Sequence, residues 1–271
     1  MSVTKIWDVE VLAASSLVHG GQTQATTTLF RRELLPQPGG GFDQVPLISG
    51  NAFRSALRRL GAELFCDALD LEGQLSAAAA AVMINGGALA KGKATALTGA
   101  RRAEVRTWII PLGLFGGAAN GVLIDGCVRA SKLVPVCMET SLVTGRSSDV
   151  SIYDLLQVED YSHTGSPDDS DEGSSASPMR YSLEVLAAGT HLTGSVQLDR
   201  GTALQDAFLT SVLDVWAQRG TIGGRVGSGH GQITATLDAH LVRGQQQSPI
   251  CWRSVLEDHR AQVLAALEVL A

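Results

Sequence analysis

Apolar and polar residues alternate along several stretches of the chain, a pattern that predicts strands with one buried face. The clearest are residues 6–11 (IWDVEV) and 190–199 (THLTGSVQLD), where apolar side chains occupy alternate positions. Residues 122–136 (VLIDGCVRASKLVPV) form another extended segment, and residues 233–241 form a final strand. Between the first strand and the next regular element we expect a loop, residues 19–45.

Other stretches repeat apolar residues at the spacing of a helix. Residues 46–61 (PLISGNAFRSALRRLG) predict a helix capped by Ser49 or Asn51, with Arg54 and Arg58 on a different face from its apolar residues. Thr202 and Gln205 form a capping-box pattern that opens a second helix, which ends at the glycine at position 220. A C-terminal amphipathic helix is predicted from Val255, Val263, Leu264 and Leu267.

The order of these elements is strand, helix, strands, an insertion, strand, helix, glycine-rich loop and strand. Such an order predicts an α+β fold built on a split βαβ, ferredoxin-like (RRM-like) core, in which helices cover one face of an antiparallel sheet. Inserted segments would supply a thumb and further helical pieces. The length of 271 residues allows one domain that spans residues 1–271.

Composition excludes several classes of protein. We expect a cytoplasmic protein, because no apolar run is long enough to span a bilayer and the N-terminus lacks the pattern of a secretion signal. The four cysteines are scattered without CxxC spacing, which argues against a structural zinc site and a disulfide scaffold. We therefore expect no metal site and no cofactor.

The net charge of −6 is concentrated in one region. Residues 154–172 carry a charge of −7 without any Lys or Arg, so the rest of the chain sums to +1. Within it, residues 163–178 (HTGSPDDSDEGSSASP) have the composition of an acidic flexible loop. Outside it, arginines cluster in groups, which favours phosphate contacts, although a scatter of solvated surface charge is the alternative. These groups are Arg31 and Arg32; Arg54, Arg58 and Arg59; and Arg101, Arg102 and Arg106.

The stretch 223–233 (GGRVGSGHGQI) places five glycines, Arg225 and His230 in one short loop. Glycine allows consecutive amides to turn toward an anion, so the loop is typical of a phosphate cradle; a tight turn is the alternative. It is not a Walker-type loop, which needs Lys followed by Ser or Thr and then a helix. Nor does it match a dinucleotide fingerprint, since a helix precedes it and a strand follows.

Four segments together resemble landmarks of the RAMP superfamily, the ferredoxin-like RNA-binding subunits of CRISPR effectors. Residues 46–59 (PLISGNAFRSALRR) resemble its IPGSSLKGALR-type segment, and GLFG at 113–116 resembles its LFG turn. Residues 182–196 (SLEVLAAGTHLTGSV) and the loop 223–233 follow in the family's order. The set is most similar to the backbone subunits, and the LISGNAFR and FRRE spellings to the type IV version.

The resemblance implies a non-catalytic backbone subunit that binds guide RNA (crRNA), forms a homo-oligomeric helical filament along it, and joins other CRISPR effector subunits. It also implies a palm on the ferredoxin-like core and an inserted thumb at residues 136–181. Such a protein grips phosphate and ribose and leaves the base edges free to pair.

Carried over by position, the resemblance assigns RNA contacts to the loop and helix start after residue 48 and to the glycine loop. Arg58 extends the basic face of Arg54, with a solvated helix residue as the equal alternative, and His230 is expected to satisfy a turn carbonyl. The predicted RNA-binding residues are Arg31, Arg32, Ser49, Gly50, Asn51, Arg54, Arg58, Gly223, Gly224 and Arg225.

Two other function classes stay open. Some related backbone subunits cleave RNA with an aspartate in the loop after the first strand, but residues 20–42 contain no Asp. This absence argues against cleavage by such an aspartate. An endoribonuclease of the superfamily that uses His19 or Asp43 is the alternative. A small-molecule or protein-binding scaffold, in which the glycine loop is only a turn, is the third class.

Overall fold

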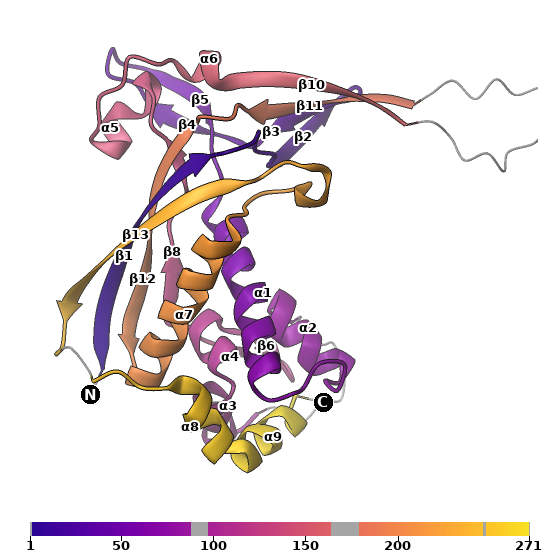
Figure 1. Ribbon diagram of the computed structural model, residues 1–271, viewed down its shortest axis with the longest axis vertical. Helices are drawn as coiled ribbons and strands as arrows, with labels where there is room; N and C mark the ends of the chain where they lie inside the picture. Colours follow the sequence, from indigo (N-terminus) through magenta and orange to yellow (C-terminus); the bar gives the residue numbers. More distant parts are fainter. Residues whose placement is uncertain (1, 88–96, 164–178, 246–247, 271) are drawn as a thin grey trace, which may run out of the picture.

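A central antiparallel sheet organises the molecule (Figure 1). The computed structural model describes residues 2–87, 97–163, 179–245 and 248–270. The sheet has the order β13-β1-β12-β8, with β9 also pairing with β12. Its strands are β1 (Val3–Ala13), β8 (Val128–Ala130), β9 (Val134–Pro135), β12 (His191–Gly201) and β13 (Ile233–Arg243).

Two helices, α1 (Gly50–Ala68) and α7 (Ala203–Arg219), pack on one face of this sheet (Figure 1). The predicted caps are confirmed: the Ser49 hydroxyl accepts from the amide of Ala52, and Thr202 forms a capping box with Gln205. The buried rings of Phe53 and Trp216 meet between the helices with centroids 4.9 Å apart. The chain is thus an α+β protein, as its apolar pattern predicted.

The segment predicted as a loop, residues 19–45, instead forms four short strands. These are β2 (Gly20–Gln24), β3 (Thr27–Phe30), β4 (Arg32–Pro36) and β5 (Phe42–Pro46), paired as β2 with β3 and β4 with β5. All of β2 is exposed, so its sequence has no apolar alternation to predict a strand. Backbone hydrogen bonds to β3 hold β2 in place instead.

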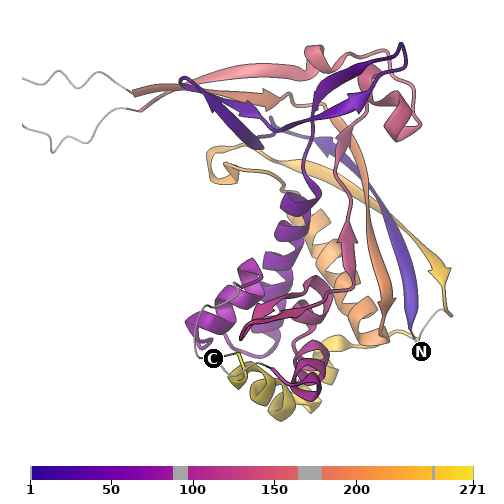
Figure 2. The same cartoon turned by 180° about the vertical axis from the view of Figure 1, so that it is seen from behind.

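A second sheet, of order β10-β11-β3-β2, contains the long hairpin of β10 (Leu156–His163) and β11 (Met179–Leu186). Both views show this hairpin projecting away from the body of the molecule (Figures 1 and 2). All of β10 and the first three residues of β11 fall in the predicted thumb, residues 136–181, and β11 continues to Leu186. Residues 164–178 of the predicted acidic loop lie outside the described residues.

Smaller elements complete the fold, most of them helices at the end of the molecule away from the hairpin (Figure 1). The predicted C-terminal helix is two helices, because the chain breaks at His259. The predicted segment 122–136 is likewise divided among β7, β8 and β9. None of the described helices is long and apolar enough to cross a membrane. The remaining elements are α2 (Ala77–Asn85), α3 (Gly99–Trp108), α4 (Ile110–Phe115), β6 (Gly117–Ala119), β7 (Val122–Ile124), η1 (Met138–Thr140), α5 (Ser141–Thr144), α6 (Ile152–Leu155), η2 (Val226–Ser228), α8 (Trp252–Asp258) and α9 (Arg260–Glu268).

Candidate nucleic-acid interface

The face of the central sheet that α1 and α7 leave uncovered is acidic. Asp8 on β1 lies directly opposite Asp238 on β13, whereas Glu10, two positions further along β1, is paired with Arg146. Their side chains alternate with the buried Trp7 and Val9, so they point away from the helices. Phosphate would be repelled here, and these strand positions offer carboxylates where an RRM-type sheet presents stacking aromatics. A nucleic-acid backbone therefore fits better elsewhere.

The glycine-rich loop packs tightly against the chain segment that follows β1. The amide of Gly224 donates to the carbonyl of Val18 at 2.7 Å, and the amide of Gly231 donates to Ser16 at 2.9 Å. Gly223 has φ +85°, and a Cβ there would lie 2.5 Å from the carbonyl oxygen of Val18. Glycine is therefore needed for close packing of chain on chain. The amides of Gly224 and Gly231 serve the fold, so any anion contact of this loop must use other groups.

Arg225 projects from this loop onto two tyrosines that are paired with each other in the hairpin. Its guanidinium donates to the Tyr181 hydroxyl at 2.9 Å and lies 4.9 Å from that ring's centroid. The Tyr181 and Tyr161 rings are stacked, with centroids 5.4 Å apart. Arg225 is exposed and takes the left-handed conformation, with φ +56°. Because its partner is a neutral phenol, this contact orients the charge of Arg225 without cancelling it.

His230 is buried beneath the same loop. One ring nitrogen lies 2.9 Å from the Ser16 hydroxyl, and the other lies 2.7 Å from the Tyr161 hydroxyl. This agrees with the predicted structural role, although hydroxyls take the place of the expected turn carbonyl. The residue ties the loop to both the end of β1 and the hairpin.

His19 supports the N-terminus of α1. The Ser49 amide donates to Nε2 of His19 at 3.2 Å, and the Ser49 hydroxyl lies at the same distance. Because an amide can only donate, this nitrogen accepts and the ring proton is on Nδ1. Burial, and then the nearby charge of Arg31, lower the pKa of His19 below its usual 6.5. The neutral ring therefore supports the cap at neutral pH.

A groove of about 310 Å³ separates α1 from the glycine loop. On the helix side it is lined by Ala52, Ser55 and Arg59, which follow one another at helical spacing. On the loop side it is lined by residues 221–224 and Val226, with His19 nearby. The first turn of α1 adds backbone amides that have no partner within the helix. An arginine, a helix N-terminus and a glycine-rich backbone thus meet around one groove.

Arg54 and Arg58 lie on another face of α1 and hold the turn after α4. Arg54 donates to the carbonyl of Phe115 at 2.5 Å; Arg58 donates to that carbonyl and, at 2.7 Å, to Gly116. Arg58 is buried, and burial followed by the charge of Arg54 lowers its pKa to about 10, so it stays charged at neutral pH. Their predicted RNA contacts stay predictions, but these hydrogen bonds give both residues a structural role.

Of the remaining predicted residues, some are exposed and others have structural contacts. Arg31 is exposed beside His19, and its amide donates to the His19 carbonyl at 2.7 Å. Arg32 forms an ion pair with Glu184 of β11. A Cβ on Gly50 would lie 2.7 Å from the carbonyl oxygen of Ala130, so glycine is required where α1 meets β8, whereas Asn51 is exposed. The structure brings Arg31, Ser49, Gly223 and Gly224 to one region, with Arg225 on the same loop.

Sequence reasoning did not single out Arg59 or the two tyrosines. Arg59 appeared only as a member of an arginine group, yet it lies seven residues after Ala52, two helical turns on, in phase with the groove. That spacing was a usable signal. No sequence signal indicated Tyr161 and Tyr181, because their stacking depends on the register of a hairpin whose two strands are separated by 15 residues of sequence.

Comparison with solved structures supplies the family. A chain of a structure titled "Type IV-B CRISPR Complex" matches with 31% sequence identity and a TM-score of 0.64, over 90% of this chain and 95% of that chain. The chain belongs to the family of type IV CRISPR complex subunits. No protein-family model and no curated protein matches it. The predicted relation to type IV CRISPR effectors is therefore confirmed.

Protonation of His19 is expected to destabilise the protein. Since the pKa of His19 is lowered in the folded state, the unfolded chain takes up a proton first as the pH falls below about 6.5. The free energy of unfolding should therefore fall between that pH and the lower pKa of the folded state. Urea unfolding from about pH 7.5 to about pH 5 measures this. His19→Gln should flatten the decline and His240→Gln should keep it; equal profiles would contradict the role of His19.

Proposed function

We propose that this type IV subunit is a guide-RNA-binding backbone subunit of the RAMP superfamily. It polymerises along the RNA as a helical filament and works in the cytoplasm with other CRISPR effector subunits. The observation that carries the proposal is the groove between α1 and the glycine loop. Arg59 lines it, Arg31 adjoins the lining residue His19, and Arg225 lies on the loop that forms its other wall. Most of the remaining lining is backbone and small side chains.

The proposed core is the ferredoxin-like fold. Its four successive strands would be β1, β8, β12 and β13, with α1 after the first and α7 after the third. Their order in the sheet, β13-β1-β12-β8, with every neighbour antiparallel, supports this assignment. In this arrangement the ends of β1 and α7 and the start of α1 meet on one side of the sheet, where the groove lies.

The groups around the groove suit an RNA backbone of any sequence. The N-terminus of α1 favours negative charge, and the exposed guanidinium of Arg59 can donate hydrogen bonds to a phosphate. Ser55 offers a hydroxyl to ribose. None of these three groups needs to contact a base edge, so a guide held here keeps its bases available for pairing.

The hairpin of β10 and β11 is the proposed thumb. It carries the stacked Tyr161 and Tyr181, with Arg225 held against them. An aromatic pair beside a cation suits a nucleotide displaced from the stack of its neighbours. The hairpin also projects from the body of the molecule (Figure 2), the arrangement expected of a segment that contacts an adjacent subunit in the filament.

We propose that the subunit does not cleave RNA. The groups named for the endoribonuclease alternative have structural partners: Nε2 of His19 accepts from Ser49, and Asp43 accepts from the Tyr153 hydroxyl at 2.6 Å. Both are therefore occupied in supporting the fold. Incubation of purified protein with labelled RNA, with and without Mg²⁺, should give no specific products; products lost in His19→Gln or Asp43→Asn would favour the enzyme.

RNA binding by the purified protein tests the proposal. Nucleic acid should copurify, and RNA-free protein should bind two unrelated RNA sequences with affinities within about threefold of each other, because backbone contacts dominate. The number of subunits per RNA, measured by mass photometry, should rise with RNA length. Strict preference for one sequence, or a single subunit on every length of RNA, would contradict it.

A further inference from the structure

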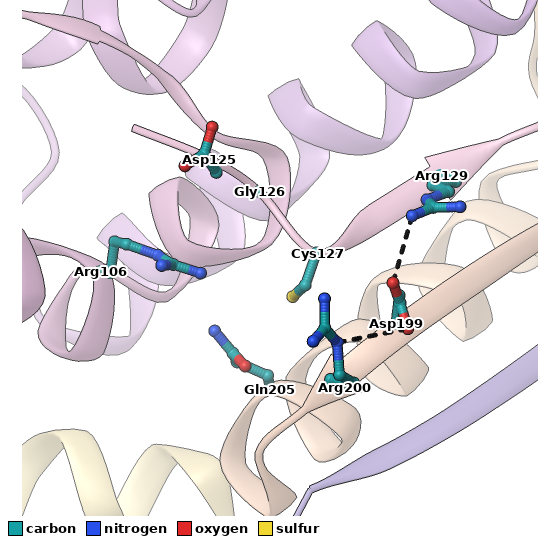
Figure 3. Close-up of a pocket in the computed structure, with 8 residues that line it drawn as sticks. All are labelled: Arg106, Asp125, Gly126, Cys127, Arg129, Asp199, Arg200 and Gln205. Carbon is teal, nitrogen blue, oxygen red and sulfur yellow. Dashed lines mark hydrogen bonds and ion pairs between the residues drawn. The ribbon is translucent and has the colours of Figure 1, made fainter. Parts of the chain in front are cut away.

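A second basic cavity, of about 520 Å³, is lined by residues that the groove does not share (Figure 3). The groove is lined by residues 221–224, just after the end of α7, whereas this cavity is lined by Gln205 in the first turn of α7. The 17 residues of α7 correspond to a helix length of about 25 Å. The cavity is thus a separate site, and its ligand need not be the RNA held in the groove.

Arginines from three different elements converge on this cavity. Arg106 comes from α3, Arg129 from β8 and Arg200 from β12, and Gln205 of α7 points in beside them (Figure 3). Arg129 and Arg200 share Asp199, at 3.2 and 3.9 Å, and Asp125 pairs with Arg102 at 2.9 Å. The lining itself thus has three guanidinium groups and two carboxylates, and Arg102, outside the lining, neutralises Asp125. Together the six groups carry a formal excess of two positive charges.

Two of these arginines have features that a ligand would explain. The Nε of Arg106 is buried and has no hydrogen-bond partner, an arrangement that costs free energy unless a ligand or water accepts from the guanidinium. Arg200 has φ +52°, a left-handed conformation that is uncommon for residues other than glycine. That backbone turn sends its side chain into the cavity toward Cys127 (Figure 3). Strained residues of this kind are concentrated at binding sites.

Cys127, in the middle of the lining, does not neutralise the arginines. Burial raises the pKa of its thiol to about 11, against the opposing effect of Arg106, so the thiol is uncharged at neutral pH. Its sulfur lies 3.5 Å from the carbonyl of Gly113, consistent with a neutral S–H donor. The positive charge of the cavity therefore remains available to an anion.

We propose that this cavity is a phosphate-binding site for a nucleotide, either free or at the end of an RNA chain. Planar guanidinium groups match phosphate oxygens in pairs, and Asp125 and Gln205 can accept from the hydroxyl or amino groups of the attached nucleoside. A bare phosphate would leave much of 520 Å³ empty, whereas this volume lies in the range of small-molecule sites. The site is independent of the proposed guide-binding groove.

Calorimetric titration of RNA-free protein with ADP tests the site, with adenosine as the ligand that lacks phosphate. ADP should bind once per chain and adenosine should not bind measurably. Arg106→Gln should weaken ADP binding about tenfold or more, the loss expected for a charge-assisted contact. Arg129→Gln should also weaken it, and since that side chain is 72% exposed, its replacement leaves the fold intact. Arg253→Gln, an exposed arginine on α8, is the charge-matched control and should bind as wild type.

A short RNA with a 5′-phosphate, compared with the same RNA bearing a 5′-hydroxyl, distinguishes the two sources of phosphate. Preference for the phosphorylated end that Arg106→Gln removes would assign the site to an RNA terminus, whether or not ADP binds. The proposal is overturned if neither ligand saturates one site per chain, or if Arg106→Gln, Arg129→Gln and Arg253→Gln behave alike. Arg59→Gln should leave ADP binding unchanged, so failure here is distinct from failure of the groove.

Discussion

Replacing Arg59 and Arg225 together by glutamine is expected to weaken RNA binding about a hundredfold near 0.1 M salt. Each side chain is exposed, Arg59 lines the groove, and Arg225 lies on the loop that forms its other wall. A guanidinium–phosphate hydrogen bond contributes about 1.5 kcal/mol, or about tenfold in affinity, so two losses multiply when the contacts are independent. Fluorescence anisotropy with a labelled RNA measures the change.

The matched control is Arg101→Gln combined with Arg253→Gln. Both arginines are exposed, one on α3 and the other on α8, and neither lines the groove. This control removes the same charge and should change the affinity less than about threefold, since distant surface charges are screened by salt. If both double variants lose affinity equally, binding is a diffuse effect of net charge and the groove is not the contact surface.

Replacing Arg58 by alanine is expected to lower the free energy of unfolding by about 3 kcal/mol. The change removes the hydrogen bonds to the carbonyls of Phe115 and Gly116, and it leaves a cavity in a buried part of α1. Arg58→Lys should recover only part of the loss, because an ammonium group does not reproduce the planar fork of a guanidinium. Urea unfolding followed by circular dichroism measures both variants.

Arg59→Ala is the comparison that makes the Arg58 result informative. The two residues are adjacent arginines in one helix, so replacement by alanine changes the helix propensity by the same amount at both positions, but Arg59 is exposed. Its replacement should change stability by less than about 0.5 kcal/mol while weakening RNA binding. If Arg58→Ala is as stable as Arg59→Ala, the hydrogen bonds of Arg58 to the turn after α4 do not stabilise the fold.

The strand β1 and the starts of the helices α1 and α7 were predictable because each has a local sequence signal. In β1, the buried Trp7, Val9 and Val11 alternate with Asp8 and Glu10. The starts of α1 and α7 were also predictable, since Ser49 and Thr202 act through local hydrogen bonds within the next three residues. In both cases the signal and the structure lie within one short segment.

The four short strands of residues 20–46 were not predictable in the same way. Every residue of β2 is exposed and β4 has no buried residue, and β3 pairs with β11, about 150 residues away in the chain. No local apolar pattern encodes such a contact. Sequence analysis therefore assigned a loop where backbone pairing forms strands.

The site shows the same limit. Arginine clusters and glycines marked the region of the candidate site, but which side of α1 faces the groove depends on how the helix packs. Arg54 and Arg58 reach the turn at residues 115–116, and the amide of Gly224 reaches Val18. These long-range hydrogen bonds give residues predicted to contact RNA a structural role as well, and Arg59, which the prediction did not include, lines the groove.

The salt dependence of RNA binding tests most directly whether this groove grips the RNA backbone. For single strands, the slope of log K against log salt concentration is about −0.7 for each phosphate contact. Replacing Arg59 and Arg225 by glutamine should therefore reduce the magnitude of the slope by about 1.4 relative to the wild type, whatever the RNA sequence. An unchanged slope would mean that neither arginine contacts phosphate, and it would contradict the proposed groove.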